Sequence, residues 1–527
     1  MKWLRCLLCL LLPMALLPLS LQAQLAQTLR LEIPASPTET ESFDVLPLTD
    51  KAVLVSIQSG GFPDNTPPRY RFLKYDSQLR PIWARDIQLP KLFRPVLMYS
   101  DAQYSYQLLR ELDSNHFQVV RLHTDDGQID SFDGTLVEQM SIEQFKVLGN
   151  QAYIGGYFHN RPIVLTFSFF DRSIRVLPSL YANHLEISSL EVDPINMEVN
   201  VLVHTVKQHC RFSIQTYNYD SRLVRTVHFD GKENSLVSGK LLPINEHETL
   251  LIGNYSADCT PYSQGIYVTR LRRDDSGEPD RDVPGTSTHT GNIQYIEFSQ
   301  FESFFNFLPP KRQQKILARL MHRKALGKNN RFRYRMLVHD LQPSPTGLTL
   351  VAEVYYPQYR SSTLPGNMRN VDRLEGYRYT HAFVCGFDAT GQLLWDNCLP
   401  INDLLSRDLT SKVQLSQQGD RIVLAYPTDG TIHTEVIEGR TVVQKPASVR
   451  LLTTNGDAER IVYSGHSELM PWYDRHFLAF GFQKIAPRDN MALQREVFYI
   501  NKLSYDTNLH LPLLRNATSR KTVGSER

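Results

Sequence analysis

The sequence predicts an all-β protein, a single β-propeller of seven or eight four-stranded blades with a helical hairpin inserted late in the chain. The first observation behind this is that short runs of alternating apolar and polar residues, rich in Tyr, Phe, Val, Ile and Thr, recur between Gly, Asp, Asn and Pro. The second is that one strand–turn–strand pattern returns about every 50 residues. The third is that the last copy lacks a strand that the N-terminal region can supply.

The repeated unit is a strand that runs into an acidic turn and on into a second strand, as in Tyr70–Trp83 and His381–Trp395. Another apolar strand precedes most copies, for example Arg421–Tyr426. In a propeller each blade covers the apolar face of the next, and the sequence repeats with a period of about 40–50 residues. Tandem β-sandwiches are the alternative, and they would repeat at about 90–100 residues. The turn acids are Asp76, Asp125, Asp171, Asp220, Asp274, Asp388, Glu438 and Asp506.

The two ends of the repeat predict how the ring closes. The last unit stops after its third strand at Asp506, and a lone strand, Gln27–Ile33, precedes the first full unit. Pairing the early strand with the last blade would protect the weakest seam of the ring, because it leaves no open edge there. The propeller is therefore expected to span residues 24–506, followed by a flexible tail at 507–527.

Residues 1–23 are typical of a secretory signal peptide. Lys2 and Arg5 precede a short apolar run that contains Pro13 and Pro18, and a small residue, Ala23, ends it. An uncleaved membrane anchor is the alternative, but the run is short for a bilayer. No later run approaches the length of a transmembrane span, so we expect a periplasmic or secreted protein without an anchor after cleavage.

The cysteines left after cleavage number four, and an even number in an exported chain favours two disulfides. Cys385 and Cys398 flank a predicted hairpin turn, and Cys210 and Cys259 lie in neighbouring repeats and are paired by elimination. Four free buried thiols are the alternative. No cysteine or histidine spacing matches a zinc site.

One segment, 274–340, departs from the repeat. It opens with a polar loop, then Ser299–Glu302 matches a capping box, and an apolar run at helical spacing predicts a first helix before Pro309. A second helix is predicted from Lys311 to Leu326, with Gly327 as its stop. The candidate partner-binding residues on this hairpin are Phe301, Phe304, Phe305, Lys311, Arg312, Lys315, Arg319, Arg323 and Lys324.

The hairpin has two interpretations. Ten basic residues fall between Lys311 and Arg335 without an intervening acid, which favours docking to an acidic partner or an anionic surface. Alternatively, the three phenylalanines pack on the propeller and the charges only face solvent. Nucleic acid is disfavoured as a partner, because 57 basic residues balance 55 acidic ones over the chain.

Motifs for catalysis or cofactor binding are absent from the sequence, which contains no nucleophile elbow, zinc-protease helix, phosphate loop or dinucleotide fingerprint. We therefore expect neither a metal nor a cofactor, and the sequence favours a binding protein over an enzyme. The best local alternative is a cluster of Glu353, Asp372, Glu375 and His381 that would suit binding or cleavage of a glycan. The tyrosines around it could form an aromatic platform: Tyr355, Tyr356, Tyr359, Tyr377 and Tyr379.

The stretch Leu348–Pro400 resembles a family of uncharacterised exported β-propeller proteins from bacteria with type IX-like outer-membrane export. The resemblance implies a propeller and an envelope location, and it transfers no catalytic residue. With the basic insert, it leads to the hypothesis of a non-enzymatic envelope scaffold that binds a protein partner, such as an outer-membrane export assembly to which it would be an accessory subunit. A glycan-binding or glycan-cleaving propeller is the alternative.

Overall fold

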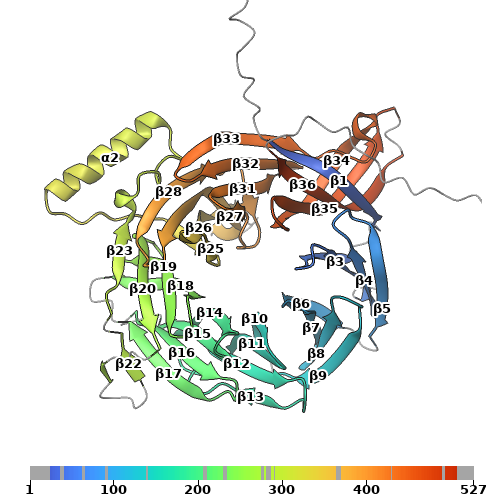
Figure 1. Cartoon of the computed structure of the whole chain (residues 1–527), viewed down its shortest axis with the longest axis horizontal. Coiled ribbons are helices and arrows are strands. Elements are labelled where there is room, and N and C mark those ends of the chain that lie inside the picture. The colour runs from blue at the N-terminus through green and yellow to red at the C-terminus, as the bar shows by residue number, and fades with distance from the viewer. Residues whose placement is uncertain are drawn as a thin grey trace, which may run out of the picture.

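A computed structural model of the chain contains eight four-stranded blades arranged in a ring (Figure 1). The structure describes residues 24–35, 41–61, 66–89, 93–137, 140–205, 210–229, 234–273, 278–279, 286–289, 291–363, 370–428, 430–489 and 493–506. The predicted signal peptide, 1–23, and the predicted tail, 507–527, lie outside the described residues. The propeller prediction is confirmed, and the number of blades is eight.

The first four blades follow in chain order, each an antiparallel meander. Blade 1 is β2 (Ser42–Pro47), β3 (Val53–Gly61), β4 (Thr66–Tyr75) and β5 (Pro81–Gln88). Blade 2 is β6 (Phe93–Ser100), β7 (Tyr104–Glu111), β8 (His116–His123) and β9 (Ile129–Thr135). Blade 3 is β10 (Ser141–Leu148), β11 (Gln151–Phe158), β12 (Arg161–Ser168) and β13 (Ile174–Val176). Blade 4 is β14 (Leu185–Asp193), β15 (Glu198–Thr205), β16 (Phe212–Asn218) and β17 (Leu223–Phe229), and β22 (Thr286–Thr288) and β21 (Glu278–Pro279) extend its outer edge.

The last four blades include the departures from the common pattern. Blade 5 is β18 (Ser235–Pro243), β19 (Glu248–Ser256), β20 (Gly265–Arg272) and β23 (Gln294–Glu297). Blade 6 is β24 (Arg335–Val338), β26 (Gly347–Thr363), β27 (Asn370–Asp388) and β28 (Leu393–Pro400), with short β25 (Gln342–Ser344) and β29 (Leu405–Ser406) beside β26 and β27. Blade 7 is β30 (Gln414–Gln418), β31 (Arg421–Thr428), β32 (Thr431–Glu438) and β33 (Thr441–Arg450). Blade 8 is β34 (Glu459–Pro471), β35 (His476–Pro487), β36 (Arg495–Asp506) and β1 (Gln24–Pro34), and a 3-10 turn, η3 (Gly456–Ala458), precedes it.

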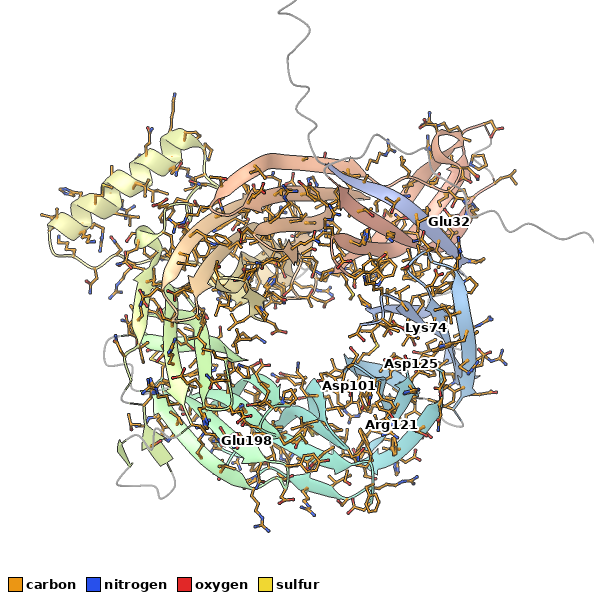
Figure 2. All side chains as sticks on the ribbon, in the orientation of Figure 1. Glu32, Lys74, Asp101, Arg121, Asp125 and Glu198 are labelled. Carbon is orange, nitrogen blue, oxygen red and sulfur yellow. A yellow bond between two sulfur atoms is a disulfide. The ribbon has the colours of Figure 1, made fainter. Side chains whose placement is uncertain are left out.

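The core of the ring lies between neighbouring blades. Each blade contributes one fully buried tyrosine to this core, from the second or the third of its strands. These tyrosines are Tyr70, Tyr106, Tyr153, Tyr217, Tyr267, Tyr379, Tyr426 and Tyr499. Polar contacts add to the packing between blades: Lys74 donates to the carbonyl of Thr124 at 2.8 Å, and Lys502 donates to that of Ser77 at 3.0 Å (Figure 2 labels Lys74).

Six of the eight predicted acidic turns lie where the sequence predicts them, between the third and fourth strands of their blades. Asp274 lies outside the described residues, and Asp506 ends β36, whose outer neighbour β1 comes from the N-terminal region. Asp76 accepts hydrogen bonds from the backbone N–H groups of two residues that follow it, both at 2.8 Å, and Asp388 does the same at 2.8 and 2.9 Å. Such side-chain bonds mimic a backbone turn. In blade 2 the neighbouring Asp126 has this role in place of Asp125, and in blade 4 Asn218 has it in place of Asp220.

Ring closure follows the prediction. The N-terminal strand β1 pairs antiparallel with β36, from Gln24 opposite Asp506 to Pro34 opposite Val497. A buried charge network crosses this seam at Glu32, which is labelled in Figure 2. Its carboxylate pairs with Arg30 at 2.6 Å and with Arg495, and Arg495 also reaches Glu459 at 3.1 Å.

The insert between blades 5 and 6 differs from the predicted helical hairpin. Only its second arm is an α-helix, α2 (Pro310–Ala325), whereas the first arm is a single 3-10 turn, η2 (Phe298–Gln300), followed by non-helical turns. Phe301, Phe304 and Phe305 are 4%, 0% and 2% exposed, because they fill the interface between blades 5 and 6. Aromatic packing against the ring therefore determines the conformation of this segment, and the prediction of a first α-helix from the spacing of its phenylalanines is wrong.

Candidate functional site

The basic insert retains one surface that could meet a partner. Helix α2 stands at the outside of the ring (Figure 1), and none of its residues is buried. Ile316, Leu317 and Leu320 rest on the core between blades 5 and 6, which fixes the helix against the ring along one side. The exposed basic side chains are Lys311, Arg312, Lys315, Arg319 and Lys324, with Arg323 half-buried.

The charges of α2 are uncompensated in the part of the chain that the structure describes. Between Glu302 and Asp340 the sequence has no acid. Of the ten basic residues from Lys311 to Arg335, Arg331 alone has a described carboxylate within reach, Asp258 at 3.8 Å. The field of α2 is therefore positive, and an anion nearby would be attracted to it.

The three phenylalanines proposed to bind a partner cannot do so, and this prediction is corrected. Phe304 contacts the rings of Phe298 and Phe383, with centroids 4.0 and 5.3 Å away, and Phe301 contacts Phe383 at 4.6 Å. Asp396 of β28 locks the same segment to blade 6, accepting the backbone N–H groups of Glu302 and Ser303 at 3.0 and 2.7 Å. Removal of the segment would therefore open the core.

The tyrosines proposed as one platform lie on two faces of the β26–β27 hairpin. Tyr355 pairs in register with Tyr379, and both pack with Tyr377 in the core facing blade 7. Tyr356 and Tyr359 are 46% and 58% exposed. They are three residues apart on β26, so their side chains point to opposite faces of the strand. The five tyrosines therefore do not form one aromatic platform.

The carboxylate and histidine cluster is not assembled. Glu353 is fully buried and accepts the backbone N–H groups of Lys412 and Val413, both at 2.7 Å, so it holds the connection into blade 7. His381 directly precedes Ala382, the register partner of Glu353, and so points to the other face, where it stacks on Phe307 at 3.8 Å. Burial lowers the pKa of His381 to about 3, which leaves it neutral.

The remaining members of that cluster are no closer to a catalytic arrangement. Glu375 lies on the protruding hairpin and accepts a hydrogen bond from Gln358 at 2.8 Å. The side chain of Asp372 lies outside the described residues. Neither Glu353 nor His381 is free to serve as a general acid, so glycan cleavage has no support at this position.

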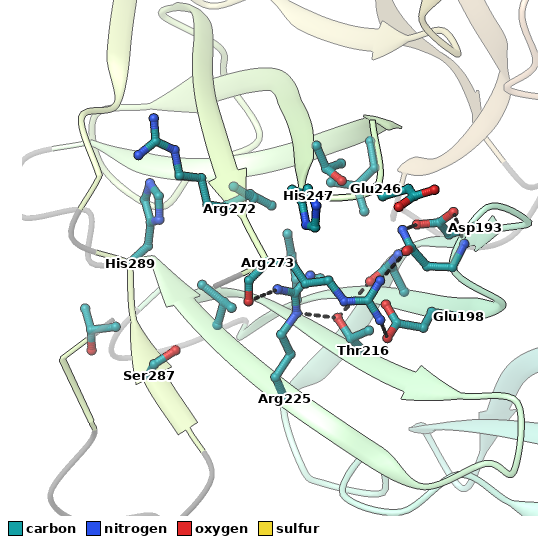
Figure 3. Close-up of a pocket in the computed structure, with 18 residues that line it drawn as sticks. Asp193, Glu198, Thr216, Arg225, Glu246, His247, Arg272, Arg273, Ser287 and His289 are labelled. Atoms are coloured by element: carbon teal, nitrogen blue, oxygen red, sulfur yellow. Dashed lines mark hydrogen bonds and ion pairs between the residues drawn. The ribbon is translucent and has the colours of Figure 1, made fainter. Parts of the chain in front are cut away.

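A small polar cavity between blades 4 and 5, which sequence reasoning did not identify, is shown in Figure 3. Arg273 spans it, pairing with Glu198 at 2.6 Å and donating to Asn196. Arg225 donates to Thr216 and to the carbonyl of Arg273, each at 3.4 Å. Burial raises the pKa of Glu198 and outweighs the opposing effect of Arg273 and Arg225.

The volume of this cavity, about 30 Å³, decides what it can hold. A buried water needs roughly 10–15 Å³ by this measure, so the space fits water and excludes a sugar or nucleotide. Three carboxylates line it, Asp193, Glu198 and Glu246, and they balance the three arginines Arg225, Arg272 and Arg273. We therefore assign it a structural role at the blade interface.

The cysteine predictions are half right. Cys210 and Cys259 form a disulfide, with Cα atoms 5.6 Å apart, that joins the loops between the second and third strands of blades 4 and 5. Cys385 and Cys398 are free and buried. The register places Cys398 opposite Phe383 and Cys385 opposite Asp396, and this diagonal offset is too long for a disulfide.

Among the described residues no cluster of three or more His, Cys, Asp or Glu side chains could hold a metal ion. The helices of the described part of the chain include none with the length and apolar character needed to cross a membrane.

Comparisons with known proteins identify no family for this chain. No protein-family model and no curated protein matches the chain. Solved structures that are similar include the Dos1 propeller (10% identity, TM-score 0.42, 91% of this chain and 95% of that one). Others are the polysaccharide lyase Uly1 (10%, 0.39, 78% and 89%) and the β-propeller domain of the Trilobed protease from Pyrococcus furiosus (7%, 0.34, 77% and 97%). Similarity this low carries no argument about ligand, activity or partner.

Proposed function

We propose that the protein is a non-enzymatic scaffold of the bacterial envelope whose helix α2 docks onto an acidic surface of a partner protein. The observation that carries this proposal is the uncompensated charge of α2: six Lys and Arg residues in sixteen, no acid, and no buried residue. An outer-membrane export assembly is the partner that the sequence resemblance implies. A periplasmic location is part of the proposal, supported by the signal-like residues 1–23 and by the disulfide Cys210–Cys259.

A protein partner fits α2 better than a lipid surface. Helices that bind in the membrane interface insert an apolar face between the lipids. The apolar residues Ile316, Leu317 and Leu320 of α2 are already packed on the ring, which leaves Met321 and Leu326 as its exposed large apolar side chains. A cationic face held rigidly above a folded ring suits a complementary acidic protein surface.

The test is charge reversal, because deletion of the insert would open the core. In the variant Lys311→Glu, Lys315→Glu, Arg319→Glu, envelope pull-downs should lose a partner that wild type recovers and that has an acidic surface. Binding of that purified partner to wild type should weaken as salt rises. The matched control reverses three exposed turn arginines at the opposite ends of the strands, Arg80, Arg222 and Arg440, and should keep the partner. Retention of the partner by the α2 variant would refute the proposal.

Glycan binding is a second candidate function, favoured by two exposed tyrosines of β26, Tyr356 and Tyr359. Aromatic side chains can stack on the faces of sugar rings. The experiment is a glycan array followed by calorimetry with the double variant Tyr356→Ala, Tyr359→Ala. Absence of binding to wild type, or binding unchanged in the variant, would exclude this function.

A further inference from the structure

The hairpin of blade 6 extends beyond its own sheet. Strands β26 and β27 have 17 and 19 residues. β28 pairs with β27 from Phe387 to His381, and β29 pairs only with Arg378 and Tyr377. From Gly376 back to Asn370, β27 pairs with β26 on one side and, among the described residues, with no strand on the other. This segment is therefore an open sheet edge with unpaired backbone groups.

A wide groove runs along this open edge. It has a volume of about 940 Å³, enough for an extended segment of chain, and it lies between the hairpin and the connection that follows β29. Leu374, Gly376 and Leu405 contribute its apolar and backbone surface. Gly376 allows β29 to come close, since a Cβ atom there would lie 2.5 Å from the carbonyl oxygen of Ser406.

Three arginines line the same groove, namely Arg360, Arg373 and Arg407. Arg360 and Arg373 face each other across β26 and β27, and Arg407 follows β29 directly. All three are exposed, and none has a carboxylate partner within the described part of the chain. The lining contains one acid, Glu375, which accepts a hydrogen bond from Gln358 at 2.8 Å. The groove is therefore strongly positive.

We propose that this groove binds an extended acidic polypeptide segment, which adds as a strand to the free edge of β27 and places its carboxylates on Arg360, Arg373 and Arg407. An open edge provides backbone hydrogen bonds, and guanidinium groups bind carboxylates in a bidentate manner. The site is separate from α2 and goes beyond the proposed docking of that helix. The groove and α2 lie at the same end of the ring. In an antiparallel four-stranded blade, the turn between the second and third strands and the connection to the next blade fall at the same end, and the β26–β27 hairpin and α2 are connections of these two kinds.

Other occupants fit these observations less well. A second copy of the chain would bring the same three arginines to the same edge, and like charges would repel. An anionic polysaccharide would satisfy the arginines but would leave the backbone edge of β27 unpaired. An acidic strand supplies carboxylates to the arginines and backbone hydrogen bonds to the edge of β27.

The test uses the full mature protein and a labelled twelve-residue peptide of alternating Glu and Thr, followed by fluorescence anisotropy. Wild type should bind this peptide, and the double variant Arg373→Gln, Arg407→Gln should bind it about tenfold or more weakly. The α2 charge-reversal variant should bind within about twofold of wild type, which separates failure of this proposal from failure of the helix docking. Circular dichroism confirms that the variants are folded.

Two control ligands test the mode of binding. A peptide of alternating Gln and Thr lacks the carboxylates, and an acidic peptide with alternate backbone nitrogens methylated cannot pair with an edge. Both should bind at least about tenfold more weakly than the parent peptide. The proposal is overturned if wild type does not bind the parent peptide, if the methylated peptide binds equally well, or if oligogalacturonate binds more tightly than the parent peptide.

Discussion

The substitution Glu435→Gln should stabilise the ring at alkaline pH. Glu435 lies on β32, is 3% exposed, and has one carboxylate oxygen, Oε1, without a hydrogen-bond partner. It stands opposite Leu424, which belongs to the apolar cluster between blades 6 and 7. Burial without an opposite charge raises the pKa of Glu435 from 4.5 to about 7.

The expected magnitude follows from linkage. Because the folded pKa lies above the unfolded one, the folded state binds the proton more tightly, and the penalty for ionisation grows as pH rises. It is absent below about pH 4.5 and complete above about pH 7. At 1.36 kcal/mol per pKa unit, the penalty is about 3 kcal/mol. Glutamine cannot ionise, so Glu435→Gln should gain up to about that amount at pH 8.5 and almost nothing at pH 4.5.

The assay is urea unfolding of wild type and variant across this pH range. The control is Glu246→Gln, which removes the charge of an exposed side chain and should change the free energy of unfolding by less than about 0.5 kcal/mol at every pH. The reasoning about Glu435 is refuted if Glu435→Gln is destabilising at pH 8.5, or if its effect does not vary with pH.

Two further predictions concern the seam and the thiols. Glu32→Gln should cost about 2–3 kcal/mol in unfolding free energy at neutral pH, because Arg30, 2% exposed, loses its carboxylate. Burial opposes ionisation of Glu32, but Arg495 and Arg30 outweigh burial and lower the pKa of Glu32. The difference in unfolding free energy between wild type and Glu32→Gln should therefore fade as the pH falls below the pKa of a free carboxyl group. An equal loss of stability in the control Asp474→Asn, which removes a carboxylate from an exposed ion pair, would contradict the role of Glu32 at the seam. Without reductant, Ellman's reagent should detect no thiol in the native mature protein and two, Cys385 and Cys398, after unfolding; reaction of the native protein would show that they are not buried.

The fold was largely predictable because every blade is a similar antiparallel sheet that packs its apolar faces against the neighbouring blades. Neighbouring blades must bury large side chains between them, and every blade contributes one fully buried tyrosine to that core. Closure was predictable for the same reason, since a blade with three strands leaves an edge that a spare strand can cover. The choice between seven and eight blades required the structure, because the insert between blades 5 and 6 interrupts the sequence period.

Local spacing could not predict which partner a side chain finds. Phe301, Phe304 and Phe305 have helical spacing, yet the gap between blades 5 and 6 holds them in non-helical turns. Cys385 and Cys398 flank one turn, yet a bulge next to Gly386 and the register separate them. These outcomes depend on contacts that the local sequence does not encode.

The candidate sites were predictable only where charge is contiguous. The basic run of α2 is visible in the sequence because no acid interrupts it. The groove is not, because Arg360 and Arg373 come from two strands and Arg407 from a later connection. No periodicity links those three positions.

Photo-crosslinking from α2 in intact cells tests the central claim most directly. A photoreactive phenylalanine replaces Met321, which is 70% exposed beside the basic residues. Docking through α2 predicts a crosslink to one acidic envelope protein in wild type and its loss when Lys311, Lys315 and Arg319 are reversed to Glu. A helix that yields no crosslink in wild type, or the same crosslink after charge reversal, would contradict docking through α2.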